Sequence, residues 1–361
     1  MKNFTIITFN TLLLIIVFFW VPNLFFSKNE SQDIDEFPHD ENFLYIHLGS
    51  DLVKRIPLKS FAGFNDEVGY FNFRNLSTNE VLTHKGRVIY DVHYTMDSDG
   101  YRVSLPQKDK NLETVVFLGG SFVFGVGLED SDTLTSQMSS IDSNRYYLNM
   151  GRAGYGPTLI LGQVQTEVDH IVKFPPGTLF VYHRYRGGHY QRSWPTISWY
   201  KMFKFLIHYR WNKENDTLEK IGPMFGDNKI PLAYFYDFLL TSWVFDSGIF
   251  NFDYLFPDEM VAKECRVIKE VAKILKEKSY RFILAEHPLH YEFPNERFEN
   301  ADKVFRECIG NEFPVWTFQD LIIEAQRNKD KYVVDPKHEN HPNALMNQLY
   351  AQELLKKINS L

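Results

Sequence analysis

From Thr114 to the end of the chain, short apolar runs alternate with segments of helical periodicity. The runs lie at 114–119, 146–150, 177–183, 281–285 and 313–316. Helical spacing is expected from about residue 133 and over 157–172, 258–278, 302–309 and 342–358. Strands that alternate with helices favour a parallel sheet, because each crossover returns the chain to the same end of the sheet. The sequence therefore predicts a three-layer α/β fold, with one parallel sheet and helices on both faces.

One serine stands directly after the first of these strands. Ser121 follows Gly119 and Gly120 within the stretch 115–127, VVFLGGSFVFGVG. Ligands bind such sheets at the carboxyl ends of the strands, and glycines let the backbone turn tightly beneath a substrate. A serine hydroxyl becomes a good nucleophile only when an imidazole removes its proton. Ser121 is thus a candidate nucleophile, and an ordinary strand-ending turn is the alternative interpretation.

Three motifs resemble the first, second and last sequence blocks of the SGNH (GDSL-type) hydrolase family. They are FLGGSFVFGVGLEDSDT at 117–133, LNMGRAGYG at 148–156 and HPNALMNQLYAQELL at 341–355. The resemblance spans about 113–359. It implies the parallel three-layer fold, similar to that of flavodoxin, and a serine hydrolase that cleaves esters without a cofactor.

The resemblance also implies roles for particular residues. Ser121 is the expected nucleophile and His341 the expected base. The acid that orients the base stays open: Asp335 and His338 have an Asp-x-x-His spacing, whereas Glu339 stands two residues before His341. We place Asp335 first, with His338 as the alternate base and Glu339 as the alternate acid.

Hydrogen-bond donors for the oxyanion are expected from the second block and from the nucleophile. The backbone amides of Ser121 and Gly154 match the family's pattern. The third block normally supplies an asparagine side chain, but Gly188 occupies that position here. His189 or Arg192 is the candidate replacement. Loss of this one donor would cost a factor of about 10² to 10³ in turnover.

Other classes of function fit the sequence less well. The formal net charge is −7, from 39 Lys and Arg against 46 Asp and Glu, which argues against nucleic acid as a partner. The 12 histidines form no HExxH motif, and neither a P-loop nor a dinucleotide fingerprint is present, so we expect no metal and no cofactor. Cys265 and Cys308 either pair in an oxidising compartment or remain two buried thiols.

The amino terminus carries a long apolar segment. Residues 4–26 hold no charged side chain over 23 positions, and a helix of that length, about 34 Å, can cross a hydrocarbon core of about 30 Å. We expect an uncleaved anchor at 1–27 rather than a cleaved signal peptide. Lys2 precedes the segment and acidic residues follow it, which predicts a cytoplasmic N-terminus and a periplasmic or extracellular remainder.

The remainder divides by composition into a polar linker at 28–41, a β-rich extension at 42–112 and a hydrolase-like domain at 113–361. The domain carries an aromatic-rich insertion at 190–256, which is either additional core or a lid over a glycan or acyl chain. An external location favours O-acyl groups on envelope glycan or lipid as the ester substrate. An O-acyltransferase and an inactive glycan- or partner-binding protein are the alternative functions. The oligomeric state is not predicted.

Overall fold

The computed structural model describes residues 43–47, 52–57, 62–65, 69–186, 190–193, 207–223, 257–289 and 300–361. The expected anchor at 1–27 and linker at 28–41 lie outside these ranges. No helix in the described ranges is long and apolar enough to cross a bilayer.

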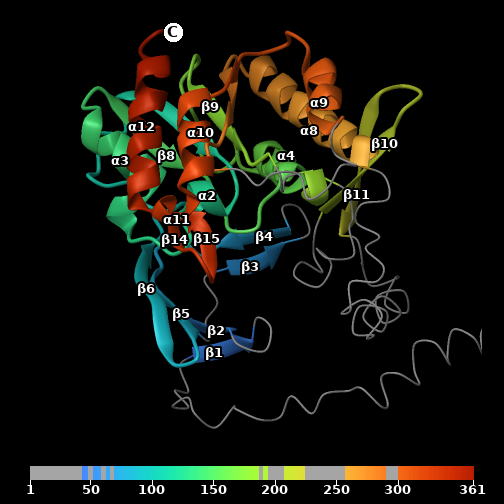
Figure 1. Cartoon of the computed structure of the whole chain (residues 1–361). Helices are drawn as coiled ribbons and strands as arrows, with labels where there is room; N and C mark the ends of the chain where they lie inside the picture. Colours follow the sequence, from blue (N-terminus) through green and yellow to red (C-terminus); the bar gives the residue numbers. More distant parts are fainter. Residues whose placement is uncertain are drawn as a thin grey trace, which may run out of the picture.

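A five-stranded sheet with the strand order β13-β12-β9-β7-β8 forms the centre of the fold (Figure 1). All four neighbouring pairs of strands are parallel, as predicted. The strands are β7 (Glu113–Leu118), β8 (Arg145–Asn149), β9 (Leu179–Arg184), β12 (Arg281–Glu286) and β13 (Val315–Trp316). Their carboxyl ends meet at one edge, where the sequence places Ser121 after β7.

Helices cover both faces of this sheet (Figure 1). One face carries α3 (Leu134–Ile141), α10 (Gln319–Arg327) and α12 (Ala344–Ile358), which enclose Phe117 and Val181. The other carries α4 (Pro157–Thr166), α8 (Pro257–Glu277) and α9 (Ala301–Ile309), which enclose Val116 and Phe180. Neighbouring residues of β7 and β9 thus enter opposite cores, as the alternation of side chains along a strand requires. The predicted three-layer arrangement is confirmed.

Two local features differ from the sequence-based prediction. The helix expected over 157–172 ends at Thr166, and the backbone departs from helical geometry at Asp169, which has a φ of +71°. Between them Glu167 binds the buried Arg152, with Oε1 2.6 Å from Nη1. Helices α10 and α11 (Lys329–Tyr332) and the hairpin of β14 (Val333–Asp335) and β15 (Glu339–Pro342) were not predicted. The α11, β14 and β15 segments are only three or four residues long, too short to show a period, whereas α10 does bury Leu321, Ile322 and Ala325 at helical spacing.

The β-rich extension contains a four-stranded antiparallel sheet with the order β1-β2-β5-β6 and a separate β3–β4 hairpin. The strands are β1 (Phe43–His47), β2 (Leu52–Pro57), β3 (Ala62–Asn65), β4 (Gly69–Asn72), β5 (Ser77–His84) and β6 (Arg87–Thr95). Leu82 and Tyr94 of the β5–β6 hairpin share a small core with Phe124 and Val126, which follow Ser121. The extension therefore supports the loop that carries the candidate nucleophile.

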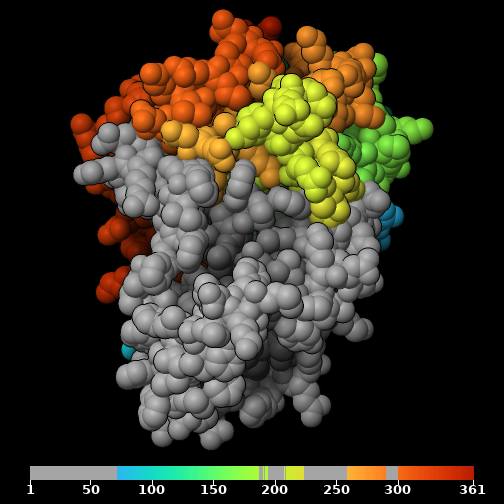
Figure 2. Space-filling model, turned by 90° about the vertical axis from the view of Figure 1, so that its right-hand side faces the viewer, coloured from blue at the N-terminus to red at the C-terminus, as the bar shows by residue number. Residues whose placement is uncertain are grey.

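The described part of the aromatic-rich insertion includes a hairpin of β10 (Ile207–Asn212) and β11 (Thr217–Pro223). Ile207 and Tyr209 are buried in the core beneath α4 and α8. Figure 2 shows the hairpin at the surface beside α8, where Arg266 donates to Asp216 at 2.7 Å. Ile207 and Tyr209 therefore extend the core, whereas most of the hairpin is exposed. The choice between core and lid for the whole insertion stays a prediction, because most of residues 190–256 lie outside the described ranges.

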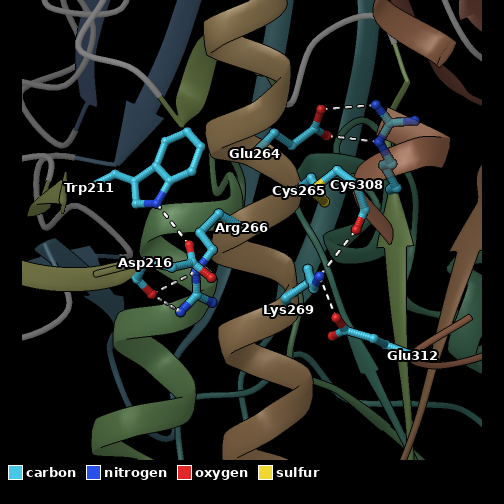
Figure 3. The surroundings of a disulfide bond; sticks show 9 residues. Trp211, Asp216, Glu264, Cys265, Arg266, Lys269, Cys308 and Glu312 are labelled. Atoms are coloured by element: carbon cyan, nitrogen blue, oxygen red, sulfur yellow. Dashed lines mark hydrogen bonds and ion pairs between the residues drawn. A yellow bond between two sulfur atoms is a disulfide. The ribbon is translucent and has the colours of Figure 1, made fainter. Parts of the chain in front are cut away.

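A disulfide joins Cys265 of α8 to Cys308 of α9 (Figure 3). Of the two states that the sequence leaves open, the structure has the paired one. Glu264, next to Cys265, forms a two-bonded ion pair with Arg184 at 2.8 and 2.9 Å, and both side chains are fully buried. On the other side, Lys269 donates to the Cys308 carbonyl at 3.1 Å. The disulfide and the Lys269 hydrogen bond therefore fix α9 to α8, and the ion pair fixes α8 to β9.

Candidate active site

Ser121 is held at the start of a single helical turn, α2 (Ser121–Phe124), directly beyond β7. Gly125 ends the turn with a φ of +84°, and its amide donates to the Ser121 carbonyl at 2.8 Å. Ser121 is buried, with 9% of its surface exposed. As the first helical residue, Ser121 has a backbone N–H with no acceptor inside the helix. That amide remains available to a bound oxygen.

Two glycines allow this turn to lie close to its surroundings. A Cβ on Gly119 would stand 2.4 Å from Cγ2 of Val123, and one on Gly151 would stand 2.5 Å from the amide nitrogen of Phe124. Any larger residue at either position would push α2 away from the sheet. Close packing against α2 thus explains why Gly119 of the first motif and Gly151 of the second motif are glycines.

The second motif supports the nucleophile turn through hydrogen bonds. Asn149 Nδ2 donates to the Val123 carbonyl at 2.8 Å, and its Oδ1 accepts from the Gly151 amide at 3.0 Å. The Arg152 amide donates to the Gly119 carbonyl at 3.1 Å. Gly154 adopts a φ of +80° in the same loop but is not among the described residues that line the pocket beside Ser121. Its role as an oxyanion donor stays a prediction.

Arg102, which sequence reasoning did not single out, holds the loop that follows α2. Its fully buried guanidinium donates to the carbonyls of Phe124 at 2.9 Å, Gly125 at 2.5 Å and Leu128 at 2.5 Å. It also pairs with Asp130 at 3.0 Å. Burial lowers the pKa of Arg102, while the neighbouring Tyr94 and Asp130 oppose this shift. One side chain therefore satisfies three backbone carbonyls next to the nucleophile.

Substituting Arg102 with leucine is expected to lower the free energy of unfolding by about 3–5 kcal/mol, because Asp130 and the loop carbonyls lose a buried partner. Denaturant unfolding would measure the change. Arg210→Leu is the matched control, since its pair with Glu219 is 3.7 Å long and both side chains are about two-thirds exposed. We expect that control to change stability by less than about 1 kcal/mol. An equal effect of the two substitutions would contradict the role given to Arg102.

His341 lies in the β14–β15 hairpin, just before α12. Its Nδ1 contacts a carboxylate oxygen of Glu339, and its backbone amide lies 3.3 Å from the same oxygen. The two residues are two positions apart in β15, so their side chains leave the same face of the strand. Because Glu339 engages Nδ1, Nε2 is the nitrogen of His341 that is left for other contacts. The Phe122 ring, next to Ser121, packs 5.3 Å from the imidazole.

Asp335 and His338 bind the extension rather than His341. Asp335 Oδ2 pairs with Arg87 at 2.6 Å, and Oδ1 accepts from the amides of Lys337 and His338 at 3.0 Å each. Burial alone would raise the pKa of Asp335, but these amide bonds and Arg87 hold it below the usual value. The His338 ring stacks on His84 with 3.9 Å between centroids. Figure 1 shows β6, which carries Arg87, beside β14.

Ser121, Glu339 and His341 line one cavity of about 280 Å³. Its other lining residues are Gly120, Phe122, Val123, His183, Tyr185, Arg192, His287, His338 and Asn340. Within the described ranges, Ser121 Oγ and the His341 ring share no hydrogen bond. In enzymes without substrate such contacts are often long and tighten when substrate binds. The structure thus brings the expected nucleophile, the expected base and the alternate acid to one pocket.

The predicted replacement donors have different outcomes. Arg192 lines the pocket, and its Nη1 donates to the Tyr155 carbonyl of the second motif at 2.8 Å. His189 lies outside the described residues. The structure adds His183 and His287, at the carboxyl ends of β9 and β12, which sequence reasoning missed. No group of three or more metal-ligating side chains occurs in the described part of the chain.

No protein-family model and no curated protein matches the chain. Similar solved structures include a lipolytic protein of the G-D-S-L family from Veillonella parvula (11% identity, 69% of this chain, 99% of that chain, TM-score 0.39). Another is an α/β hydrolase enzyme from the metagenome of Lake Arreo, Spain (12% identity, 68% of this chain, 94% of that chain, TM-score 0.38). A third is AlinE4, an SGNH-hydrolase family esterase (13% identity, 70% of this chain, 98% of that chain, TM-score 0.32). These proteins include members of the family that the three motifs resemble, but such low similarity assigns no role to any residue.

Proposed function

We propose that this chain is a serine esterase that acts through an acyl-Ser121 intermediate. The observation that carries the proposal is the meeting of Ser121, His341 and Glu339 at one cavity, with Glu339 on Nδ1 of the imidazole. A nucleophile, a base and a group that orients the base are the parts that acyl transfer from a serine requires. Asp335, the acid first expected, is engaged by Arg87 instead.

In the proposed reaction, Ser121 Oγ attacks the ester carbonyl carbon while His341 Nε2 accepts the hydroxyl proton. The tetrahedral intermediate then collapses, and the alcohol leaves with the proton from His341. Water attacks the acyl-serine, again through His341, and releases the carboxylic acid. Glu339 holds the ring in the tautomer with Nε2 unprotonated and stabilises the imidazolium that forms.

The developing oxyanion needs hydrogen-bond donors in the same cavity. The Ser121 amide, without an intrahelical acceptor, is one candidate, and the Gly154 amide stays a second. Because Arg102, Asn149 and Arg152 hold the loops on either side of α2, the Ser121 amide is fixed before substrate arrives. Such preorganisation is the main source of electrostatic stabilisation in acyl transfer.

The natural substrate is proposed to be an O-acyl ester on envelope glycan or lipid. Three observations support a location outside the cytoplasm: the uncharged segment at 4–26, the acidic residues after it, and the Cys265–Cys308 disulfide. Disulfides persist in oxidising compartments. The volume of about 280 Å³ suits a short acyl group rather than a long chain.

A fluorophosphonate that reacts with activated serines tests the proposal directly. We expect the full-length protein in detergent to be labelled at Ser121, located by mass spectrometry of the digested chain, and to hydrolyse p-nitrophenyl acetate. Ser131, exposed in the same segment, is the internal control and should stay unlabelled. A folded protein that neither reacts at Ser121 nor turns over the ester would overturn the proposal.

A further inference from the structure

His183 is a buried histidine that lines the pocket but has no part in the proposed reaction. It is the fifth residue of β9, with 2% of its surface exposed. In the sheet, Leu118 of β7 stands opposite Tyr182, so His183 lies beside Gly119, two residues before Ser121. Its ring packs 4.6 Å from the Phe117 ring. The side chain thus stands in the inner wall of the cavity, next to the strand that presents the nucleophile.

Tyr350 determines which nitrogen of His183 carries the proton. The Tyr350 hydroxyl lies 3.1 Å from Nδ1 and makes no other hydrogen bond with the described residues. If the hydroxyl donates to Nδ1, only the hydrogen on Nε2 lacks a partner. If Nδ1 donates instead, both the hydroxyl hydrogen and the Nε2 lone pair lack partners. Since each unmet buried polar atom costs free energy, the first arrangement is favoured and Nε2 is a donor.

The ring is also uncharged. Burial, and then the nearby His287, lower the pKa of His183 well below its usual value. A histidine is neutral above its pKa, so His183 stays neutral at physiological pH and keeps one N–H. Its Nε2 has no hydrogen-bond partner among the described residues. A buried donor needs an acceptor, and a molecule bound in the pocket that His183 lines can supply it.

We propose that His183 donates a hydrogen bond from Nε2 to an oxygen of the acyl group bound at Ser121. This inference rests on the proposed esterase function and deepens it. His183 would supply a side-chain donor in a chain that has Gly188 where the resembled family has asparagine. Tyr350 is the positioning residue, because its hydroxyl fixes the proton of His183 on Nε2, the nitrogen that has no partner among the described residues.

Kinetics of three variants test the donor. His183→Phe keeps a ring but removes the N–H, and we expect kcat for p-nitrophenyl acetate to fall by about 10² to 10³, with KM changed less than threefold. His183→Gln restores an N–H, and its kcat should be at least tenfold higher than that of His183→Phe. Tyr350→Phe, which frees Nδ1 to take the proton, should lower kcat by about tenfold. Thermal unfolding would establish that each variant is folded.

Matched controls separate this effect from packing. His170→Phe alters an exposed histidine, and Tyr332→Phe removes a buried tyrosine hydroxyl that binds Glu324 at 2.8 Å instead. Both should retain wild-type kcat. The proposal is overturned if His183→Phe is folded and stays within threefold of the wild-type kcat, or if His183→Gln is no better than His183→Phe.

A measurement without turnover separates failure of this inference from failure of the esterase proposal. In Ser121→Ala protein with ¹⁵N-labelled histidine, NMR at pH 7 should find His183 neutral and protonated at Nε2. Acetate, the product of the test ester, should shift that signal. If wild-type protein hydrolyses the ester but acetate leaves the His183 signal unchanged at saturation, the donor role is wrong and the esterase function stands. If the shift occurs without any ester turnover, the esterase proposal fails and the acyl-oxygen site remains.

Discussion

Replacing Ser121 with alanine is expected to lower kcat/KM for p-nitrophenyl acetate by about 10⁴- to 10⁶-fold, because the attacking oxygen is lost. His341→Ala should produce a fall of similar size, since the imidazole that accepts the serine proton is lost. The double variant should be no worse than either single one, because nucleophile and base act as a unit. Steady-state kinetics of the full-length protein in detergent would measure all three.

The control for Ser121 is Ser131→Ala, at an exposed position in the same segment, which should leave the rate unchanged. Retention of more than a tenth of the wild-type activity in folded Ser121→Ala protein would show that another residue is the nucleophile. His338→Ala provides the corresponding comparison for the base. Its ring lines the cavity but stacks on His84, so we expect less than a tenfold loss.

The second large effect is expected at the acid. Glu339→Gln should lower kcat by about 10² to 10⁴, because a neutral amide neither favours the correct tautomer of His341 nor stabilises its cationic form. Asp335→Asn, the matched change at the residue first expected from sequence, should lower kcat by less than tenfold. Both substitutions preserve side-chain size and remove one carboxylate charge. The ratio of their kcat values therefore isolates the effect of the negative charge that contacts His341.

Asp335→Asn should instead affect stability, and only slightly. The pKa of Asp335 is lowered in the folded state, so its contribution is complete above the unfolded pKa of about 3.9 and is lost as the pH falls through the folded value. Because Arg87 is largely exposed, we expect the wild type to exceed the variant by less than about 1 kcal/mol at pH 7. If kcat for Asp335→Asn were as low as that for Glu339→Gln, Asp335 would have to be assigned a role as the acid that orients the base.

Much of the central sheet could be predicted from sequence because its strands are short apolar runs that end at glycine or at polar residues. Ser121 was identifiable for the same reason, since it follows such a run and two glycines. The expected acid was less certain because the sequence did not predict the hairpin of β14 and β15. Once β15 is known, Glu339 and His341 lie on the same face of one strand. Asp335 lies in the other strand, bound to Arg87, 248 residues away in sequence.

His183 could not have been selected from sequence. All six residues of β9 are buried, so no alternation of polar and apolar residues marks the ones that reach the pocket. The state of its ring depends on Tyr350, which lies 167 residues further along the chain in α12. Contacts of this kind form when elements that are distant in sequence pack together, and no local pattern in a single sequence predicts them.

The disulfide between Cys265 and Cys308 also affects how the protein would survive a break in its chain. Ser121 precedes the covalent loop, and His341 follows it. A protease that cuts one peptide bond between the two cysteines would therefore leave both fragments in a single molecule, one with the nucleophile and the other with the base. A reductant would then let the fragments separate, whereas a cut between 309 and 340 would detach His341 from any covalent link to Ser121 at once.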